Sequence, residues 1–195
     1  MPKVDVAVNV PLFAQSKGFF CGEAVAEMAR DGYPDPSNRV YYTQDDLRNN
    51  IVAHDSTATG DLNQWSTDPQ GLSECLQSLS AEPVNWVQFP TISRDDAQMF
   101  LQQSIQSTQF PVGVLIRAGE HWVLVVGYET EVDETGAEQL KFIHFYDPEP
   151  VGIGTDRTIR ASTWNGSRYF VKVKTSGTWE GKFVVVGQQS LLDQR

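Results

Sequence analysis

The pattern of apolar residues changes near Pro111, and this change constrains the fold more than any other feature of the sequence. Before it, apolar residues recur at helical spacing; after it, β-branched and aromatic residues form short runs separated by turns. Helices followed by strands predict an α+β fold, with an N-terminal helical part packed on a C-terminal antiparallel β-sheet. Because 195 residues suit one domain, we expect a single domain over 1–195, helical over about 1–110 and β over about 111–195.

Four segments of the first part have the spacing of amphipathic helices. The first begins at Cys21, where a stripe containing Val25 and Met28 starts. Asp68 and Ser93 are residue types that cap helix N-termini, and each stands at the start of such a segment. The expected helices cover residues 21–31, 44–51, 69–79 and 93–108.

The second part contains five runs that favour strands. They are Val112–Arg117, His121–Tyr128, Leu140–Tyr146, Tyr169–Val173 and Lys182–Val186. Turn residues at Gly119, Asp133–Gly136 and Gly177 separate neighbouring runs closely enough to predict antiparallel hairpins. The acidic run from Glu129 to Glu138 is interpreted as a solvated hairpin tip.

Charge and composition exclude several kinds of partner. The net charge of −10 repels phosphate backbones, so we expect no nucleic acid partner. Neither a signal-peptide pattern nor an apolar run of about 20 residues is visible, which predicts no membrane insertion and a location in the cytoplasm, or export without a recognisable signal peptide. Two cysteines and three histidines without metal-ligand spacing predict no metal site, and no cofactor is expected.

Three polar residues and a thiol stand where acyl-transfer chemistry needs them. The start of a helix carries roughly half a positive charge, which favours a thiolate at Cys21. His121 opens an expected strand and could accept the thiol proton, provided that a partner such as Asp147 orients its ring. Gln15 precedes Cys21 by six positions. Its amide and the Cys21 N–H would form a two-donor oxyanion hole.

These residues lie in three blocks that resemble papain-like cysteine peptidases, and most closely the bacterial double-glycine peptidases that process bacteriocin leaders. The blocks are Val10–Ala24, Gly119–Tyr128 and Phe145–Pro148. The resemblance implies that Cys21 is the nucleophile, His121 the general base, Asp147 its orienting residue and Gln15 the oxyanion donor. It also implies a peptide or protein substrate, with a role as a processing protease or a bacterial toxin or effector.

Other interpretations stay open at this point. A Cys21 thioester can be resolved by an amine as well as by water, so a transglutaminase-like acyltransferase is an alternative, as is a non-catalytic module with the same fold. His144 lies three residues before Asp147 and is the rival base, whereas His54 is expected in a polar loop. Strand residues three apart face opposite sides, which favours His121 over His144. Cys75 falls on an apolar helical stripe, which is typical of packing.

Overall fold

The computed structural model describes residues 3–31, 42–55, 67–80, 84–175 and 177–189. The helices are α1 (Cys21–Asp31), α2 (Gln44–His54), α3 (Pro69–Leu79), α4 (Arg94–Thr108) and α5 (Ala161–Trp164), with a 3₁₀ turn η2 (Arg117–Gly119). The strands are β1 (Lys3–Ala7), β2 (Trp86–Thr91), β3 (Val112–Ile116), β4 (His121–Val132), β5 (Glu138–Asp147), β6 (Thr155–Arg160) and β7 (Phe183–Gln188). Among these residues no helix is both long and apolar enough to cross a bilayer.

The strands of the described residues form one seven-stranded antiparallel sheet. Its order is β2-β7-β3-β4-β5-β6, and β1 pairs with β4. β4 is long enough to take two partners on one edge: β3 pairs along 121–125 and β1 along 127–131. The α+β fold expected from the sequence is confirmed.

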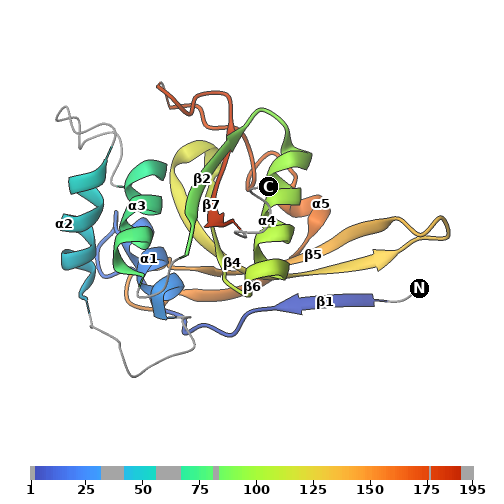
Figure 1. The fold of residues 1–195 in the computed structure, drawn as a ribbon, viewed down its shortest axis with the longest axis horizontal. Coiled ribbons are helices and arrows are strands. Elements are labelled where there is room, and N and C mark those ends of the chain that lie inside the picture. The colour runs from blue at the N-terminus through green and yellow to red at the C-terminus, as the bar shows by residue number, and fades with distance from the viewer. Residues whose placement is uncertain (1–2, 32–41, 56–66, 81–83, 176, 190–195) are drawn as a thin grey trace.

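Helices cover both faces of the sheet. In Figure 1, α1, α2 and α3 stand together to the left of β2 and β7, and α4 stands to the right. One buried cluster joins α1–α3 to the sheet and includes Val25, Met28, Ile51, Leu72, Leu124 and Val186. A second joins α4 and α5 to the sheet and includes Leu101, Ile105, Val114, Val125, Phe145 and Val185. Because both faces are covered, the central strands are apolar without alternation.

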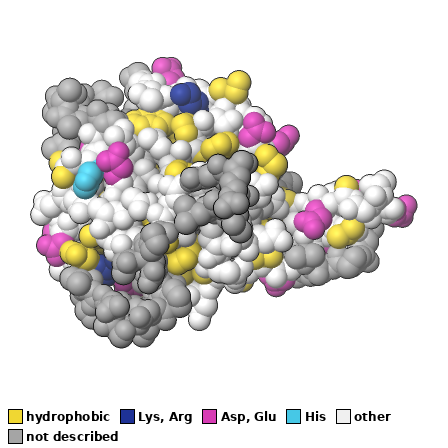
Figure 2. All heavy atoms as spheres, viewed as in Figure 1, with side chains coloured by type: hydrophobic (Ala, Val, Ile, Leu, Met, Phe, Trp, Pro, Cys, Tyr) yellow, Lys and Arg dark blue, Asp and Glu magenta, His cyan; other side chains and the backbone are white. Residues whose placement is uncertain are grey.

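The outer ends of β4 and β5 extend from this body as an arm (Figures 1 and 2). β1 runs along its base through the pairing with β4. Half of the acidic run expected to form a hairpin tip lies in the strands of the arm, since β4 continues to Val132 and β5 starts at Glu138. The turn itself is therefore shorter than predicted.

The four expected helices are confirmed. α2 is longer than expected, and the cap of α4 consists of a single side-chain hydrogen bond. α2 begins with a complete capping box formed by Thr43 and Asp46, and it continues past Ile51 to His54. At α4 the Ser93 hydroxyl accepts the Asp96 N–H as expected, but the Ser93 N–H donates to Thr91 Oγ1. That N–H is therefore satisfied outside the helix.

The expected strand Tyr169–Val173 is wrong. The Phe170 N–H donates to Trp164 O and the Val171 N–H to Tyr169 O, and only Val173 bonds across to residues 181–182, so the run forms no continuous ladder. The apolar residues here serve aromatic packing, because Phe170 stacks on Trp164 at 5.5 Å between ring centroids. The run resembled a strand because it is rich in aromatic and β-branched residues.

Three strands were not expected, and all three lie at sheet edges. β2 contains Pro90, which argues against a central strand but is tolerated at an edge. β6 is polar and alternates between exposed and half-buried residues. β1 and β2 also come from the part of the chain expected to be helical, so strands from both parts build the sheet.

Candidate active site

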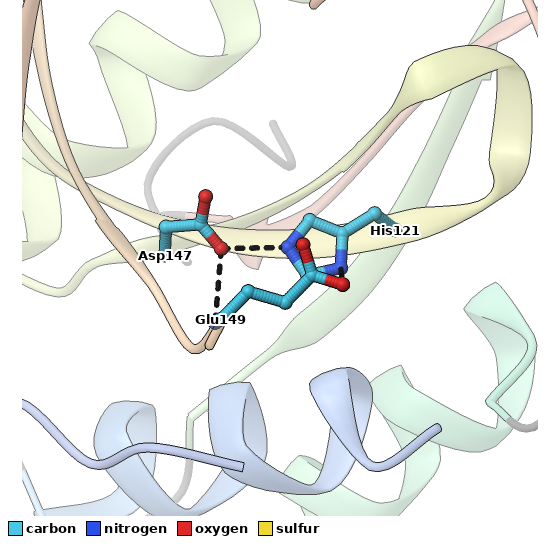
Figure 3. A group of neighbouring side chains, drawn as sticks. All are labelled: His121, Asp147 and Glu149. Atoms are coloured by element: carbon cyan, nitrogen blue, oxygen red, sulfur yellow. Dashed lines mark hydrogen bonds and ion pairs between the residues drawn. The ribbon is translucent and has the colours of Figure 1, made fainter. Parts of the chain in front are cut away.

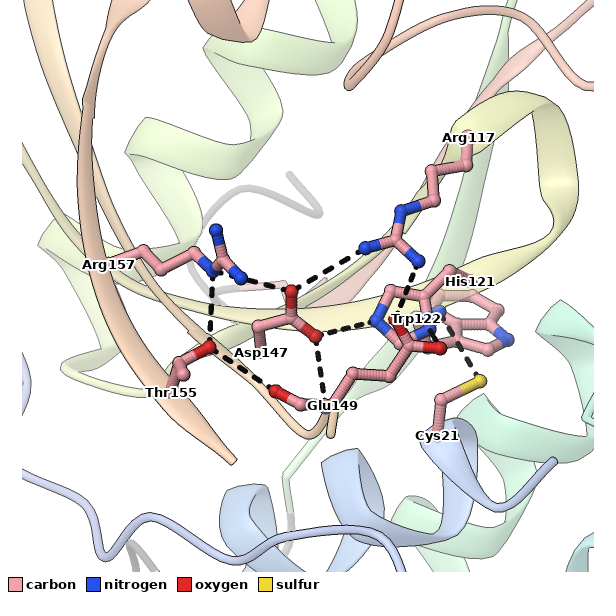
Figure 4. A network of polar contacts seen from close by, with 8 residues as sticks. All are labelled: Cys21, Arg117, His121, Trp122, Asp147, Glu149, Thr155 and Arg157. Atoms are coloured by element: carbon pink, nitrogen blue, oxygen red, sulfur yellow. Dashed lines mark hydrogen bonds and ion pairs between the residues drawn. The ribbon is translucent and has the colours of Figure 1, made fainter. Parts of the chain in front are cut away.

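Cys21 is the first residue of α1, a helix in which every residue except Glu27 is buried. The first helical hydrogen bond runs from the Ala24 N–H to Phe20 O, so the N–H groups of the first turn have no intrahelical acceptor. The Trp122 N–H donates to Cys21 Sγ at 3.5 Å. The thiol therefore lies at the positive end of a buried helix, against the start of β4 (Figure 4).

His121 begins β4 and pairs with Ile116 across the β3–β4 hairpin. Its Nε2 lies 2.7 Å from Asp147 Oδ1, and both side chains are buried. Burial acts to lower the pKa of His121, whereas hydrogen bonds to Asp147 and Cys21 and the charges of both partners raise it. The partners outweigh burial and raise the pKa from 6.5 to about 9. With Nε2 donating to the carboxylate, Nδ1 is the nitrogen left for Cys21.

Asp147 ends β5 and is held as a carboxylate. Oδ1 also accepts the Glu149 N–H at 3.0 Å, while Oδ2 lies 3.7 Å from Arg117 Nη2 and 3.5 Å from Arg157 Nε. These two guanidinium contacts are ion pairs without hydrogen-bond geometry, since Oδ2 accepts no hydrogen bond from the described residues. Burial acts to raise the pKa of Asp147, but His121, the Glu149 N–H and Arg117 outweigh it and lower the pKa.

Gln15 lies in the extended segment before α1 and is 1% exposed. Its backbone is fixed to the loop that follows Asp147, because its N–H donates to Pro148 O and its carbonyl accepts the Gly152 N–H, both at 3.0 Å. Its side-chain Oε1 is buried without a hydrogen-bond partner among the described residues. The segment is anchored beside the site, and the oxyanion role of the amide stays a prediction.

Besides Arg157, two charged residues at the site, Arg117 and Glu149, were not foreseen. Figure 3 shows the Glu149 carboxylate lying over the His121 ring, with Oε1 4.0 Å from Nδ1. Glu149 Oε2 accepts from Arg117 Nη1 at 2.7 Å. The signal available in the sequence was their position: Arg117 directly precedes the turn before His121, and Glu149 is two residues after Asp147.

Glu149 also completes the one group of potential metal ligands found in the described residues. Ligand atoms of His121, Asp147 and Glu149 all lie within 4.8 Å of one another. Asp147 Oδ1 is already bonded to the imidazole and to a backbone N–H. These bonds are those of a histidine oriented by a carboxylate.

A buried polar network connects Trp122, the neighbour of His121, to α1. The Thr67 carbonyl accepts the Trp122 Nε1–H at 2.9 Å, and its hydroxyl donates to Glu23 Oε2 at 3.0 Å. Gly22 is required here, because a Cβ at this position would lie 2.4 Å from the Thr67 side chain. Glu23 is fully buried and pairs with Arg48 Nη1 at 3.2 Å. Burial is the largest influence and raises its pKa to about 7.

The rival residues lie elsewhere. His144 Nδ1 is 2.7 Å from Thr158 Oγ1 and its Nε2 is 3.2 Å from Glu129 Oε1, which places the ring between β4 and β6. His54 Nδ1 lies 2.9 Å from Asn50 O at the end of α2. Cys75 is fully buried in the first core cluster, as expected for packing.

Comparisons with known proteins bear on the fold. No family model matches the chain, and no curated protein matches it by sequence. Among solved structures, the chain is similar to a double-glycine-motif protease from an AMS/PCAT transporter, crystallised in complex with the leader peptide. The TM-score is 0.55 at 12% identity, over 94% of this chain and 95% of the other. The two share a papain-like fold. At this identity the likeness concerns the architecture, and the residues must carry any argument about chemistry.

Proposed function

We propose that the chain is a cysteine peptidase in which Cys21 attacks the peptide carbonyl, His121 transfers the proton and Asp147 orients and charges the imidazole. The observation that carries this proposal is the 2.7 Å bond between His121 Nε2 and the buried Asp147 carboxylate, beside a thiol at a helix N-terminus. The papain-like fold of a cysteine protease supports it.

The proposed reaction follows from the two nitrogens of one ring. Nε2 is fixed on Asp147, so Nδ1 takes the thiol proton, and the resulting Cys21 thiolate bonds to the carbonyl carbon beside the imidazolium. Collapse of the tetrahedral intermediate breaks the C–N bond, and Nδ1–H protonates the leaving amine. Water, deprotonated by Nδ1, then attacks the thioester, releases the acid and restores the thiol. The negative charge of Asp147 stabilises the imidazolium at each stage.

Two hydrogen-bond donors on separate segments would stabilise the oxyanion of the tetrahedral intermediate. The Cys21 N–H belongs to the first turn of α1, where no intrahelical acceptor exists. The Gln15 side chain is buried, and its backbone is held by the loop after Asp147. A preorganised donor of this kind typically contributes 10²–10³-fold in kcat.

A peptide or protein is the proposed substrate. The similar double-glycine-motif protease was crystallised with a leader peptide, which supports a peptide ligand for this fold. A processing protease and a bacterial toxin or effector are both compatible with such a substrate.

Mass spectrometry of a digested proteome tests the proposal. Peptides incubated with the wild-type chain should gain new termini that Cys21→Ala does not produce. Addition of a primary amine separates hydrolysis from acyl transfer: amide products would assign a transglutaminase-like reaction, and free carboxyl termini a peptidase. Identical peptide sets from both chains would contradict either activity.

A further inference from the structure

A cavity of about 910 Å³ lies beside the turn that precedes His121. We call it the cationic pocket; its charged lining residues are Arg94, Arg117, Arg168, Lys172, Lys174, Glu120 and Glu180. Its volume is in the range of ligand-binding sites. The cavity is built from η2, the start of α4, residues 167–174 and Phe183 of β7.

The charge of the cationic pocket opposes that of the whole chain. Five of the chain's 15 Lys and Arg residues line it against two carboxylates, a local excess of three positive charges, although the net charge is −10. Figure 2 shows a face on which acidic side chains are widely spread and basic ones are sparse. Positive charge is therefore concentrated where the fold is hollowed.

Arg117 pairs with Glu149 and Asp147, but the other cations of this pocket form no ion pair with the described part of the protein. The Arg94 guanidinium and Lys172 Nζ lie over the same Phe183 ring, at 5.2 and 5.8 Å from its centroid. Arg94 Nε is buried without a hydrogen-bond partner among the described residues. Within that part of the chain, no carboxylate forms an ion pair with Arg94, Lys172 or Lys174. Like charges held together without counterions favour an anionic ligand.

The cationic pocket and the candidate active site share one turn. The Lys174 N–H donates to Ala118 O at 2.9 Å, and the Arg117 N–H donates to Tyr169 O at 3.0 Å. Arg117 lines the cavity and also bonds Glu149 and approaches Asp147. The turn is held in a sterically unfavourable shape, since Arg117 and Ala118 both have positive φ, of 53° and 61°. A ligand in the pocket therefore lies directly beside the residues that position His121.

We propose that the cationic pocket binds an acidic segment of the peptide substrate, next to the bond that Cys21 attacks. This inference rests on the proposed function, because the acidic segment belongs to the peptide being cleaved. A peptide supplies carboxylates on a flexible chain that can follow the turn toward Cys21. A nucleic acid would instead place many phosphates against a surface of net charge −10, which disfavours it.

Binding can be tested without turnover. We suggest fluorescence anisotropy with the Cys21→Ala chain and two fluorescein-labelled peptides, hexaglutamate and hexaglutamine. Hexaglutamate should bind about tenfold more tightly, and salt should weaken it through charge screening. Lys172→Glu and Lys174→Glu should each weaken hexaglutamate about tenfold, while the glutamine variants at these positions give smaller losses.

Lys141→Glu is the matched control. It changes the net charge by the same amount, on the arm and outside the cationic pocket, and should leave hexaglutamate binding unchanged. Circular dichroism checks that each variant is folded. Equal affinity for the two peptides, equal losses in Lys141→Glu and Lys174→Glu, or tighter binding of a single-stranded DNA hexamer would each overturn the proposal.

A kinetic measurement separates the pocket from the proposed function. Wild-type chain should show a lower KM for a cleavable peptide with an acidic flank than for its glutamine counterpart, and Lys174→Glu should remove the difference. Cleavage of both peptides with equal KM would overturn the substrate role of the pocket and leave the peptidase proposal standing. Hexaglutamate binding by a chain that cleaves nothing would support the pocket as an acidic-peptide site while the peptidase proposal fails.

Discussion

Asp147 Oδ1 lies 2.7 Å from His121 Nε2 and also accepts the Glu149 N–H, so the carboxylate that holds the imidazole is itself held by the backbone. Both side chains are almost fully buried. In this buried pair, the negative charge of Asp147 stabilises the imidazolium in place of the water that would surround it in solution.

This pair predicts the alkaline limit of activity. With the pKa of His121 at about 9, kcat/KM should fall above about pH 9 as the imidazolium is lost. Asp147→Asn removes the charge that raises this pKa, so the alkaline limb should move to lower pH and the rate should fall. Asp156→Asn, an exposed change of equal charge on β6, is the control. An unmoved limb in Asp147→Asn would contradict the assignment.

The same pKa shift has a consequence for stability. His121 titrates at 6.5 ordinarily and at about 9 in the fold, so the folded state binds more protons between these values. Its contribution to the free energy of unfolding is full below about pH 6.5 and is lost as the pH rises through 9. Urea unfolding of wild type and His121→Ala across this range should show the difference between them shrinking with pH.

The two cysteines should differ sharply in reactivity. Cys75 is fully buried, and burial together with the charge of Glu23 raises its pKa to about 12. Cys21 lies at a helix N-terminus beside His121, whose imidazole can accept the thiol proton. At about pH 6, iodoacetamide should label Cys21 much faster, as peptide mapping would show. Cys75→Ala should keep the labelling and Cys21→Ala should abolish it; equal labelling of both thiols argues against an activated Cys21.

The choice of base can be tested with two histidine variants. His121→Ala should abolish turnover, because no other described histidine contacts Cys21 or Asp147. His144→Ala removes contacts with Thr158 and Glu129 and should keep turnover within about tenfold. The opposite ranking would mean that His144, and not His121, is the base.

Gln15→Ala tests the oxyanion donor. Loss of one donor should lower kcat on the order of 10²–10³-fold with little change in KM. Circular dichroism and the rate of Cys21 alkylation should stay near wild type, since the side chain makes no bond that the fold needs through Oε1. A raised KM with unchanged kcat would make Gln15 a substrate-binding residue instead.

Glu23 predicts a second pH dependence of stability. Its pKa is about 7 in the fold against 4.5 ordinarily, so wild type should lose stability as the pH rises from 4.5 through 7, on the order of 3 kcal/mol. Glu23→Gln lacks this titration. Its free energy of unfolding in urea should therefore rise relative to that of wild type over this pH interval. Glu74→Gln, exposed on α3, should run parallel to wild type. Parallel curves for Glu23→Gln would show that the carboxyl stays ionised.

Much of this architecture could be predicted from the sequence because it depends on interactions between residues that are close along the chain. The helix that starts at Cys21, the caps at Asp68 and Ser93 and the central strands follow from local spacing, and local spacing reports which side of a segment is buried. The same blocks placed Cys21, His121 and Asp147 together as candidates. The edge strands were not predicted because they are half-exposed, and because one of them contains Pro90.

Only the tertiary structure decided which distant residues meet. Arg117 and Glu149 join at His121, and Arg94, Lys172 and Phe183 converge on one cavity, because the order of strands brings separate segments to the same end of the sheet. The run at 169–173 differs from the prediction for a related reason: aromatic and β-branched side chains fit a strand or an aromatic cluster equally well. Periodicity in the sequence indicates that a side chain is buried, whereas packing between segments determines which residues it contacts.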